Sequence, residues 1–364
     1  MNIQFIEYNN TPGSVQPIIQ AIQQQQSFIV LHYSWPDQYK QSIKTILQKL
    51  ENTHISSTEA HPSHTPTAIF ASSGTTGIPK LICHHINSLI KSAKRSLNNN
   101  PIQPNENIIL SISPAHMGGM LSVAKSMVSG ATLHVHKDWL EQSLTIPNKH
   151  YAVVPAQLEK ICLTKNNNAN ILSILVGGDK TANKLKQDSH KLPIIYSYGS
   201  TETCGQITAT PKQHAQTNIL NHSGTPLKGV RITLEDNQIA ILTDTLAYGT
   251  IQANTDTIQP LVPTTHKQAR SETPYISNDI GHINTQQEVT IIGRKDWQFK
   301  SGGSLIQPEA IETALCQHPN IEHAIIVPTE DPSYGYVPKA FVSTTLSTEE
   351  LTAYSNTQLP KYMQ

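Results

Sequence analysis

The chain has 364 residues, of which 37% are hydrophobic and 14% charged, and its 26 basic residues balance its 26 acidic ones. This length predicts two or more subdomains, since domains usually run to about 100–200 residues. The balanced charge gives no field to attract nucleic acid, and no apolar run approaches the roughly 20 residues that span a membrane. With no signal-peptide pattern and four widely spaced cysteines, we expect a cytoplasmic protein with free thiols, without nucleic-acid binding or membrane insertion.

The first two thirds of the chain show an α/β pattern. An apolar stretch at 27–33 and an expected helix at 38–52 come first, before a polar linker at 56–66. From there, short apolar runs bounded by Gly, Pro or Asn alternate with other segments, which is typical of buried strands in an α/β protein. These runs occupy residues 67–71, 107–113, 151–154, 171–176 and 192–198.

After residue 222 the pattern changes to shorter alternating strands, at 230–234 and 238–242. Alternation of this kind predicts an antiparallel β subdomain appended to the α/β core. Another apolar run, at 289–292, leads into a charged segment that begins at Gly293.

A small final domain is expected beyond this charged segment, with a helix at 308–316 and strands at 323–328 and 339–343. The predicted fold class is therefore α/β. A large N-terminal domain of α/β layers with the appended β subdomain takes residues 1–294. A small, mobile α+β domain follows a hinge and takes residues 295–364.

A loop rich in glycine and hydroxyl residues follows the expected strand at 67–71 and reads Ala71-Ser-Ser-Gly-Thr-Thr-Gly-Ile-Pro-Lys80. Glycines allow close backbone approach, and amide and hydroxyl donors suit the oxygens of a polyphosphate. Lys80 adds a mobile positive charge. The spacing is not that of a Walker loop, and the composition alone leaves an ordinary polar turn as an equal alternative.

Two later segments carry groups suited to a nucleotide. Tyr196-Ser-Tyr-Gly-Ser-Thr-Glu202 offers an aromatic ring for a purine, a hydroxyl for a phosphate and a carboxylate for Mg²⁺. Tyr275-Ile-Ser-Asn-Asp279 offers a carboxylate that can accept two vicinal hydroxyls. Taken alone, the first is also a strand end before a capped helix, and Asp279 is more often a turn residue.

The longest segment, residues 293–312, reads GRKDWQFKSGGSLIQPEAIE. Its Pro308 and Glu309 suit the first turn of a helix. In this order, the loop and the three later segments resemble the motifs of the adenylate-forming (acyl-CoA synthetase/ligase) superfamily. The resemblance runs from about Thr67 to the end of the chain.

The resemblance implies nucleotide contacts in the first two segments. In the family, the glycine-rich loop closes over the β- and γ-phosphates of ATP. Tyr198 matches the residue that stacks on adenine, Gly199 belongs to the same nucleotide-binding motif, Thr201 matches an α-phosphate contact, and Glu202 matches the Mg²⁺ ligand. The loop residues that would contact ATP are Ser72, Ser73, Gly74, Thr75, Thr76, Gly77 and Lys80.

Further roles follow from the third and fourth segments. Asp279 matches the residue that holds the ribose hydroxyls, and Arg294 matches a nucleotide contact. Asp296 matches the hinge about which the small domain rotates between two half-reactions. Gly302 and Gly303 match residues that line the tunnel for the pantetheine arm of CoA.

Two shorter matches border the acyl group. His116, in Ser113–Gly119, matches a residue beside the acyl pocket, although alone it reads as an ordinary loop histidine. Gly178, in Val176–Asp179, matches the loop that abuts adenine. Among the family's branches, the segments Ser301–Glu309, His318–Pro328 and Asp331–Pro338 most resemble the o-succinylbenzoate–CoA ligases of menaquinone biosynthesis.

The resemblance implies an enzyme that activates a carboxylic acid as its adenylate, using ATP and Mg²⁺, and then transfers the acyl group to the CoA thiol. Thr201, Glu202, Lys80 and His116 would be the catalytic residues. An aryl- or fatty-acid ligase that loads a carrier protein remains an alternative, as does a nucleotide-binding protein without turnover. The sequence leaves the acid and the oligomeric state, including a homo-oligomer, open.

The chain departs from the family pattern at both ends. Only 70 residues precede the glycine-rich loop motif, fewer than in the family's first subdomain. Leu359–Met363 resembles the segment just ahead of the family's adenylation lysine, and neither Lys339 nor Lys361 matches that lysine. Because an ammonium group stabilises developing charge, we expect the chain as written to form adenylate slowly.

Overall fold

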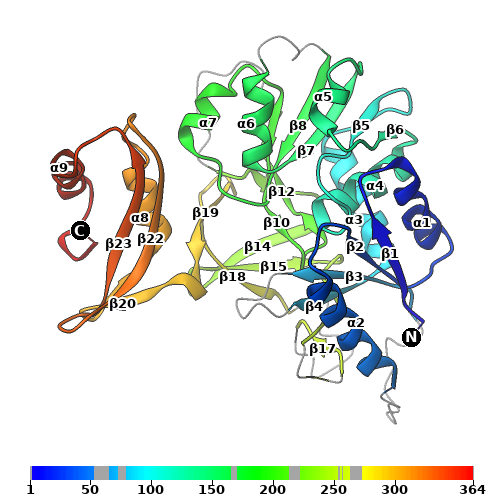
Figure 1. Cartoon of the computed structure of the whole chain (residues 1–364), viewed down its shortest axis with the longest axis horizontal. Coiled ribbons are helices and arrows are strands. Elements are labelled where there is room, and N and C mark those ends of the chain that lie inside the picture. The colour runs from blue at the N-terminus through cyan, green and yellow to red at the C-terminus, as the bar shows by residue number, and fades with distance from the viewer. Residues whose placement is uncertain are drawn as a thin grey trace.

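The structure is a computed structural model that describes residues 2–52, 65–72, 79–164, 170–212, 222–252, 255, 257–262 and 273–363. Its large domain contains two stacked sheets with helices between them and outside them, and its smaller C-terminal domain stands to one side (Figure 1). The expected α/β class is confirmed. None of the helices in the described part of the chain has the length and apolar character needed to cross a membrane.

The first sheet has six strands in the order β1-β2-β3-β4-β16-β17. β1, β2 and β3 run parallel, whereas β3 and β4 form an antiparallel pair in which Ser72 lies opposite Lys80. The two ends of the glycine-rich loop are thereby held side by side. The bounds are β1 Gln4–Tyr8, β2 Phe28–His32, β3 Thr67–Ser72, β4 Lys80–His85, β16 Gly249–Ile251 and β17 Gln259–Pro260.

The second sheet has five parallel strands in the order β6-β5-β7-β8-β9. The run at 171–176 is a strand at the expected bounds, but the run at 107–113 is a strand only as far as Ile109. The bounds are β5 Asn107–Ile109, β6 Thr132–His134, β7 Lys149–Val153, β8 Ile171–Val176 and β9 Ile194–Tyr196.

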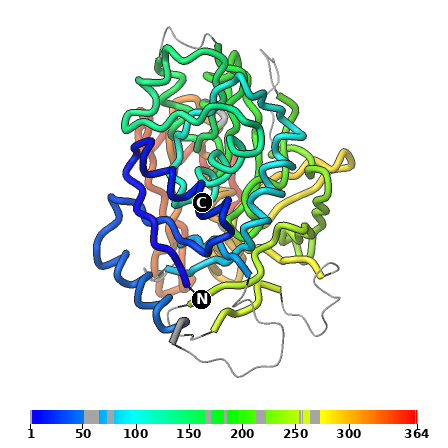
Figure 2. Tube along the Cα trace, turned by 90° about the vertical axis from the view of Figure 1, so that its right-hand side faces the viewer, coloured from blue at the N-terminus to red at the C-terminus, as the bar shows by residue number. Residues whose placement is uncertain are grey.

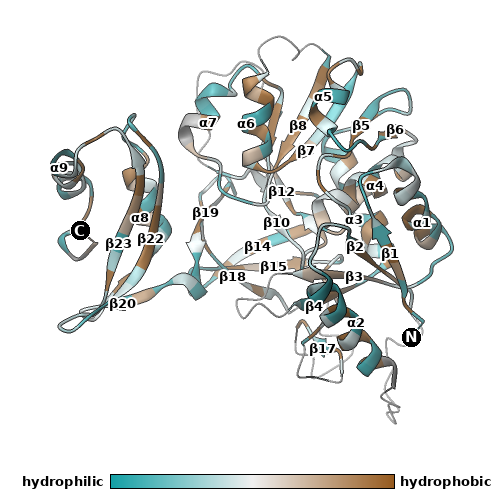
Figure 3. Ribbon diagram, viewed as in Figure 1, coloured by the Kyte–Doolittle hydropathy of each residue, from teal (hydrophilic) through white to brown (hydrophobic). Residues whose placement is uncertain are grey.

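Helices fill the space between the two sheets and cover their outer faces. α1, α3 and α4 share one buried apolar cluster with β2 and β3, while α2 packs on the opposite face of the first sheet. α5 and α6 pack on the second sheet, in which β8 is strongly hydrophobic (Figure 3). The bounds are α1 Pro12–Gln23, α2 Asp37–Asn52, α3 Ile86–Asn99, α4 Met117–Ser129, α5 Trp139–Ser143, α6 Pro155–Leu163 and α7 Asn183–Asp188.

The predicted antiparallel subdomain is confirmed as a four-stranded sheet in the order β14-β15-β18-β19. Viewed from the side, the N-terminal segment in blue and this sheet in yellow lie on opposite sides of the large domain (Figure 2). Two short hairpin-like pairs, β10 with β11 and β12 with β13, connect it to β9. The bounds are β10 Gly199–Ser200, β11 Gly205–Gln206, β12 Thr208–Ala209, β13 Thr225–Pro226, β14 Val230–Glu235, β15 Gln238–Thr243, β18 Tyr275–Ile283 and β19 Val289–Arg294.

The C-terminal domain is an antiparallel sheet, β21-β20-β23-β22, with α8 and α9 sharing one apolar cluster on a single face. The helix expected at 308–316 is confirmed and starts at Pro308. The domain follows β19 through a short 3-10 helix, η3, although a boundary at residue 294 remains a prediction. The bounds are η3 Lys295–Trp297, β20 Phe299–Ser301, β21 Ser304–Ile306, α8 Pro308–Leu315, β22 Ile321–Asp331, β23 Gly335–Thr344, α9 Thr348–Gln358 and η4 Lys361–Met363.

Candidate active site

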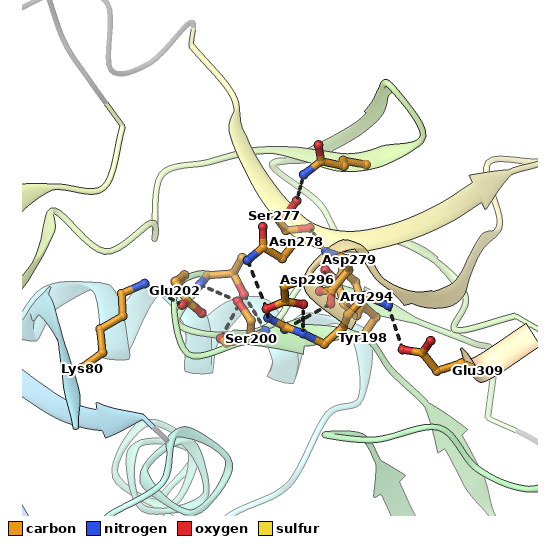
Figure 4. A network of polar contacts seen from close by, with 12 residues as sticks. Lys80, Tyr198, Ser200, Glu202, Ser277, Asn278, Asp279, Arg294, Asp296 and Glu309 are labelled. Carbon is orange, nitrogen blue, oxygen red and sulfur yellow. Dashed lines mark hydrogen bonds and ion pairs between the residues drawn. The ribbon is translucent and has the colours of Figure 1, made fainter. Parts of the chain in front are cut away.

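Lys80 and Glu202 face each other, although Lys80 begins β4 and Glu202 lies in the turn between β10 and β11 (Figure 4). Lys80 is the first residue of β4, and its Nζ atom lies 3.6 Å from Glu202 Oε1. The Glu202 side chain is 19% exposed, so its carboxylate faces the Lys80 amine at a position that is partly shielded from water. The expected loop contacts of Ser73, Gly74, Thr75, Thr76 and Gly77 fall outside the described residues, and Ser72 closes β3 with its Oγ donating to the Lys80 carbonyl.

Glu202 lies in the turn between β10 and β11, and this turn needs glycine at two points. A Cβ atom on Gly199 would lie 2.1 Å from the Gly205 carbonyl oxygen, so only glycine lets the two strands approach this closely. Gly205 has φ +85°, in the region that favours glycine. Thr203 Oγ1 accepts from the Ser200 amide at 3.0 Å and donates to the Gly205 carbonyl at 2.8 Å. Cys204 is fully buried in the core, as expected of a packing residue.

Tyr198, Asp279 and Arg294 form the second part of the site (Figure 4). The Tyr198 hydroxyl donates to Asp279 Oδ2 at 2.5 Å, and Arg294 Nη1 lies 3.6 Å from Asp279 Oδ1. Burial raises the pKa of Asp279, and the hydrogen bond from Tyr198 and the charge of Arg294 oppose this shift only in part. Burial and the neighbouring Asp279 carboxylate also raise the pKa of Tyr198. The expected ribose ligand and the expected adenine platform are therefore in direct contact.

The segment that leaves the large domain is organised around Arg294. Its Nε and Nη2 atoms donate to the two oxygens of Asp296 at 2.9 and 2.7 Å. Its amide donates to Glu309 Oε1, at the start of α8, at 2.9 Å. A Cβ on Gly293 would come within 2.7 Å of the Glu309 carboxylate, so a side chain there would require Glu309 to shift. Together these contacts join the last strand of the large domain to the first helix of the small one.

Two other expected residues lie elsewhere. His116 precedes α4 and is exposed, with its ring edge-on to Trp35 at 5.9 Å between ring centroids. Gly178 follows β8 with φ +86°, and a Cβ there would meet Val154 Cγ1 at 3.3 Å. Their acyl and adenine contacts remain predictions.

Gly302 and Gly303 form the turn between β20 and β21, both with positive φ, +51° and +85°. This turn belongs to the sheet of the C-terminal domain, which stands to one side of the large domain (Figure 1). A side chain at Gly302 would meet the Tyr334 ring at 2.7 Å, whereas one at Gly303 would meet nothing within 4 Å. The turn explains both glycines locally, and their expected role in a CoA tunnel remains a prediction.

The donor set fits the single-carboxylate Mg²⁺ site that the sequence predicts. Within the described ranges, no group of three His, Cys, Asp or Glu side chains could hold a metal ion by itself. Magnesium commonly takes one or two protein carboxylates and completes its shell with water and substrate phosphates. Glu202, partly shielded and beside Lys80, suits this kind of coordination.

The layered large domain, the smaller domain that follows the charged segment at 294–296, and the motifs that meet between β4, β10 and β18 define a two-domain adenylate-forming architecture. The chain belongs to the AMP-binding enzyme family, which matches residues 7–245, and the AMP-binding enzyme C-terminal domain matches residues 310–364. The first of these matches alone covers more than half of the chain.

Curated relatives share one activity. The 2-succinylbenzoate–CoA ligase of Haemophilus influenzae is 31% identical over 283 residues, which are 76% of this chain and 59% of the relative. The ligase of Staphylococcus aureus strain Newman is 30% identical over 341 residues, 89% of this chain and 67% of the relative. The chain thus spans 59% of the length of the Haemophilus protein and 56% of that of the Salmonella typhimurium ligase.

Solved structures share the fold. Wild-type E. coli MenE with a bound m-phenylether-linked analogue of OSB-AMS matches with a TM-score of 0.78 and 22% identity, covering 100% of this chain and 83% of that one. The o-succinylbenzoate coenzyme A synthetase of Bacillus subtilis in complex with ATP and magnesium matches with a TM-score of 0.66 and 23% identity, over 81% and 64%. At these identities the likeness is one of fold.

Two residues that support the site were not predicted from the sequence. His84, fully buried on β4, has its Nε2 atom 2.7 Å from the Thr201 carbonyl oxygen. Its position four residues after Lys80 could have indicated it, because alternate residues of a strand lie on the same face and His84 therefore shares a face with Lys80. Glu309 was assigned only to a helix start, and its reach back to the Arg294 amide had no sequence signal.

Proposed function

We propose that this protein is an AMP-forming acid–thiol ligase that activates o-succinylbenzoate with MgATP and transfers the acyl group to CoA. The observation that carries the proposal is that Lys80 pairs with Glu202, and that Glu202 lies near enough to Asp279 to raise its pKa, although the three residues come from motifs far apart in the sequence. The names of the curated relatives support the choice of acid and of CoA. ATP and CoA are cytoplasmic metabolites, and we place the reaction in that compartment.

In the first step, the substrate carboxylate attacks the α-phosphorus of ATP, and the bond to pyrophosphate breaks. Such transfers depend on positioning and charge neutralisation, with little covalent work for the protein. Lys80 and Thr201 would contact phosphate oxygens, and Glu202 would hold Mg²⁺, which neutralises charge on the polyphosphate. Asp279, fixed between Tyr198 and Arg294, would accept hydrogen bonds from the ribose hydroxyls.

In the second step, the CoA thiolate attacks the acyl carbon and AMP leaves. No protein nucleophile is required, in keeping with the burial of Cys204, whose pKa burial raises. We further propose that residues 295–364 move as a unit about Asp296 between the two steps. The Arg294–Asp296 pair is partly exposed, and exposed pairs exchange partners at little cost.

The test is to incubate the protein with MgATP, CoA and o-succinylbenzoate, and to detect acyl-AMP and acyl-CoA by mass spectrometry. We expect both o-succinylbenzoyl-AMP and o-succinylbenzoyl-CoA. Benzoate and a medium-chain fatty acid serve as comparison acids under the same conditions. Binding of MgATP without release of pyrophosphate for any acid would contradict the ligase proposal and favour a nucleotide-binding protein.

A further inference from the structure

We propose that His84 is a positioning residue for the nucleotide site: its buried ring holds the Thr201 carbonyl and thereby fixes the turn that presents Thr201 and Glu202. The inference rests on the proposed function, because it assigns a support to that same site. It adds a residue outside the four motifs, on the strand that also carries Lys80.

The strand geometry brings His84 to this position. β4 runs from Lys80 to His85, and residues four apart on a strand project from the same face, separated by about 13 Å along it. Lys80 Nζ lies 3.6 Å from Glu202 Oε1, and His84 Nε2 lies 2.7 Å from the Thr201 carbonyl oxygen. One strand therefore contacts the turn twice, through the Glu202 side chain and through the Thr201 backbone.

The hydrogen bond fixes the tautomer of the ring. A carbonyl oxygen only accepts, so Nε2 of His84 carries the hydrogen, and Nδ1 is left as an acceptor. Within the described part of the chain, the buried Nδ1 atom has no hydrogen-bond partner, and the Thr245 backbone near the ring opposes the effect of burial on its pKa only in part. Burial also lowers the pKa of His84 to about 4, which keeps the ring neutral near pH 7.

An unpaired polar atom in a fully buried position is unfavourable, and an apolar residue there would avoid it. Local conflicts of this kind are expected where a residue serves function. His84 also packs edge-on against Phe70, with ring centroids 6.0 Å apart, so a large apolar side chain would fit the packing but not the hydrogen bond. This contrast makes packing and hydrogen bonding separable by substitution.

Every residue of the turn at 201–204 is hydrogen-bonded to a part of the chain outside the turn. The carbonyls of residues 201–204 each accept a hydrogen bond from a distant part of the chain. Their donors are, in order, His84 Nε2 at 2.7 Å, Ala247 N at 2.8 Å, Thr245 Oγ1 at 3.0 Å and Ser92 Oγ at 2.6 Å. Of these four donors, His84 reaches the carbonyl of Thr201, whose side chain is proposed to meet the α-phosphate. The same carbonyl also accepts from the Cys204 amide at 3.2 Å within the turn, so His84 supplies its contact with the rest of the domain. Loss of this bond would loosen the turn where it contacts substrate.

The experiment compares His84→Gln with His84→Met. The two side chains have similar length and volume, but the Gln amide can donate to the Thr201 carbonyl and the Met thioether cannot. Calorimetry gives the Kd for MgATP, and thermal unfolding gives Tm. We expect H84M to bind MgATP about fivefold more weakly than H84Q, while H84Q stays within about twofold of wild type, since about fivefold in Kd is typical of one hydrogen bond.

His150→Met is the matched control, because His150 is also buried and bonded, to Glu106 and Ser173, but lies outside the site. It should lower Tm and leave the Kd for MgATP unchanged. Equal Kd values for H84M and H84Q, or equal losses in H84M and H150M, would overturn the inference. Wild-type protein that fails to bind MgATP would instead overturn the proposed function, and the wild-type titration is therefore read first.

Discussion

The turn at Thr201–Glu202 and the segment at Arg294–Asp296 are both rich in polar contacts, but they are held in different ways. Four consecutive backbone carbonyls of the turn are bonded from β4, α3 and the segment ahead of β16. The Arg294–Asp296 pair relies on charged side chains that are 40% and 31% exposed. Contacts between buried backbone groups are costly to break, whereas exposed ion pairs are not. The first region is suited to hold a substrate, and the second to let a domain move.

The contact between the domains fits this comparison. Lys180, just after β8, donates from Nζ to Thr313 Oγ1 of α8 at 2.6 Å. Burial lowers the pKa of Lys180, while Glu309 and Glu312 of the small domain oppose the shift. A contact through one flexible amine can be released without unfolding either domain. This contact and the hydrogen bond from the Arg294 amide to Glu309 both join the two domains through polar groups.

The largest expected effect comes from Gly199→Ala, which would break the rigid region. Its Cβ would overlap the Gly205 carbonyl oxygen, so β10 and β11 must separate. We expect the free energy of unfolding to fall by about 3 kcal/mol or more, as for other severe backbone clashes, and MgATP binding to be lost. Urea unfolding and calorimetry test this, with Gly13→Ala as the control because nothing lies within 4 Å of its Cβ. Unchanged MgATP affinity in G199A would contradict the prediction.

Glu202→Gln removes the proposed Mg²⁺ carboxylate and keeps the turn. We expect pyrophosphate release to slow by about 100-fold, as for loss of one preorganised electrostatic group, with Tm within a few degrees of wild type. Steady-state pyrophosphate assays over a range of Mg²⁺ concentrations measure the effect. The exposed Glu235→Gln should behave as wild type. Full activity in E202Q would remove Glu202 from the site.

Asp279→Asn probes the residue that links the two regions. We expect about tenfold weaker nucleotide binding at pH 7, from the loss of charge-assisted hydrogen bonds. Because burial raises the pKa of Asp279 above its usual 3.8, its carboxylate is lost at a higher pH than that of an ordinary aspartate. Wild-type affinity should therefore fall as the pH drops through that raised pKa, and D279N should not show this fall.

The raised pKa of Asp279 also makes the stability of the folded protein depend on pH. A raised pKa means that the ionised Asp279 destabilises the folded state at neutral pH, and that this cost disappears as the pH falls through the raised pKa. Urea unfolding of wild type and D279N across this range is the measurement.

The titration of nucleotide affinity has its own contradicting outcome. Identical pH profiles of nucleotide affinity for wild type and D279N would exclude Asp279 as the group that titrates.

The smallest effect on stability is expected for Asp296→Asn, which weakens the hinge pair. Since both partners are exposed, the free energy of unfolding should change by less than about 1 kcal/mol. Transfer to CoA from supplied acyl-adenylate should slow more than adenylate formation does, because hinge residues govern domain movement. Stopped-flow assays of the two half-reactions compare them. Equal slowing of both steps would argue against a hinge at this residue.

Sequence patterns predicted the layers well and the strand ends less well. The run at 171–176 is bounded by breakers and matches β8, whereas β22 extends beyond 323–328 to Ile321 and Asp331. In an antiparallel pair with one exposed face, polar residues such as Glu322 and Glu330 belong to the strand although they interrupt the apolar pattern. The run at 107–113 fails for the opposite reason, because Leu110 is buried without belonging to β5.

The contacts within the site were likewise harder to predict from the sequence than the motifs that make them. The motifs containing Glu202, Asp279 and Arg294 were found from their residue types, but their mutual contacts were not. The bond between Tyr198 and Asp279 joins residues 81 apart in sequence, and no local pattern encodes such a pair. His84 was missed because a buried histidine on an apolar strand reads as packing until its partner is seen.

The number of residues between Lys80 and His84 on β4 fixes the distance between these two side chains along the sheet. Ser72 lies opposite Lys80, and Ala68 lies opposite His84. This register with β3 fixes the positions of the Lys80 amine and the His84 imidazole along the sheet. Deleting one residue between Lys80 and His84 would turn one of them to the other face, and deleting two would shorten their spacing by about 7 Å. Point substitutions within β4 can be accommodated by repacking, but length changes cannot. Any redesign of this protein must therefore treat the number of residues between Lys80 and His84 as fixed.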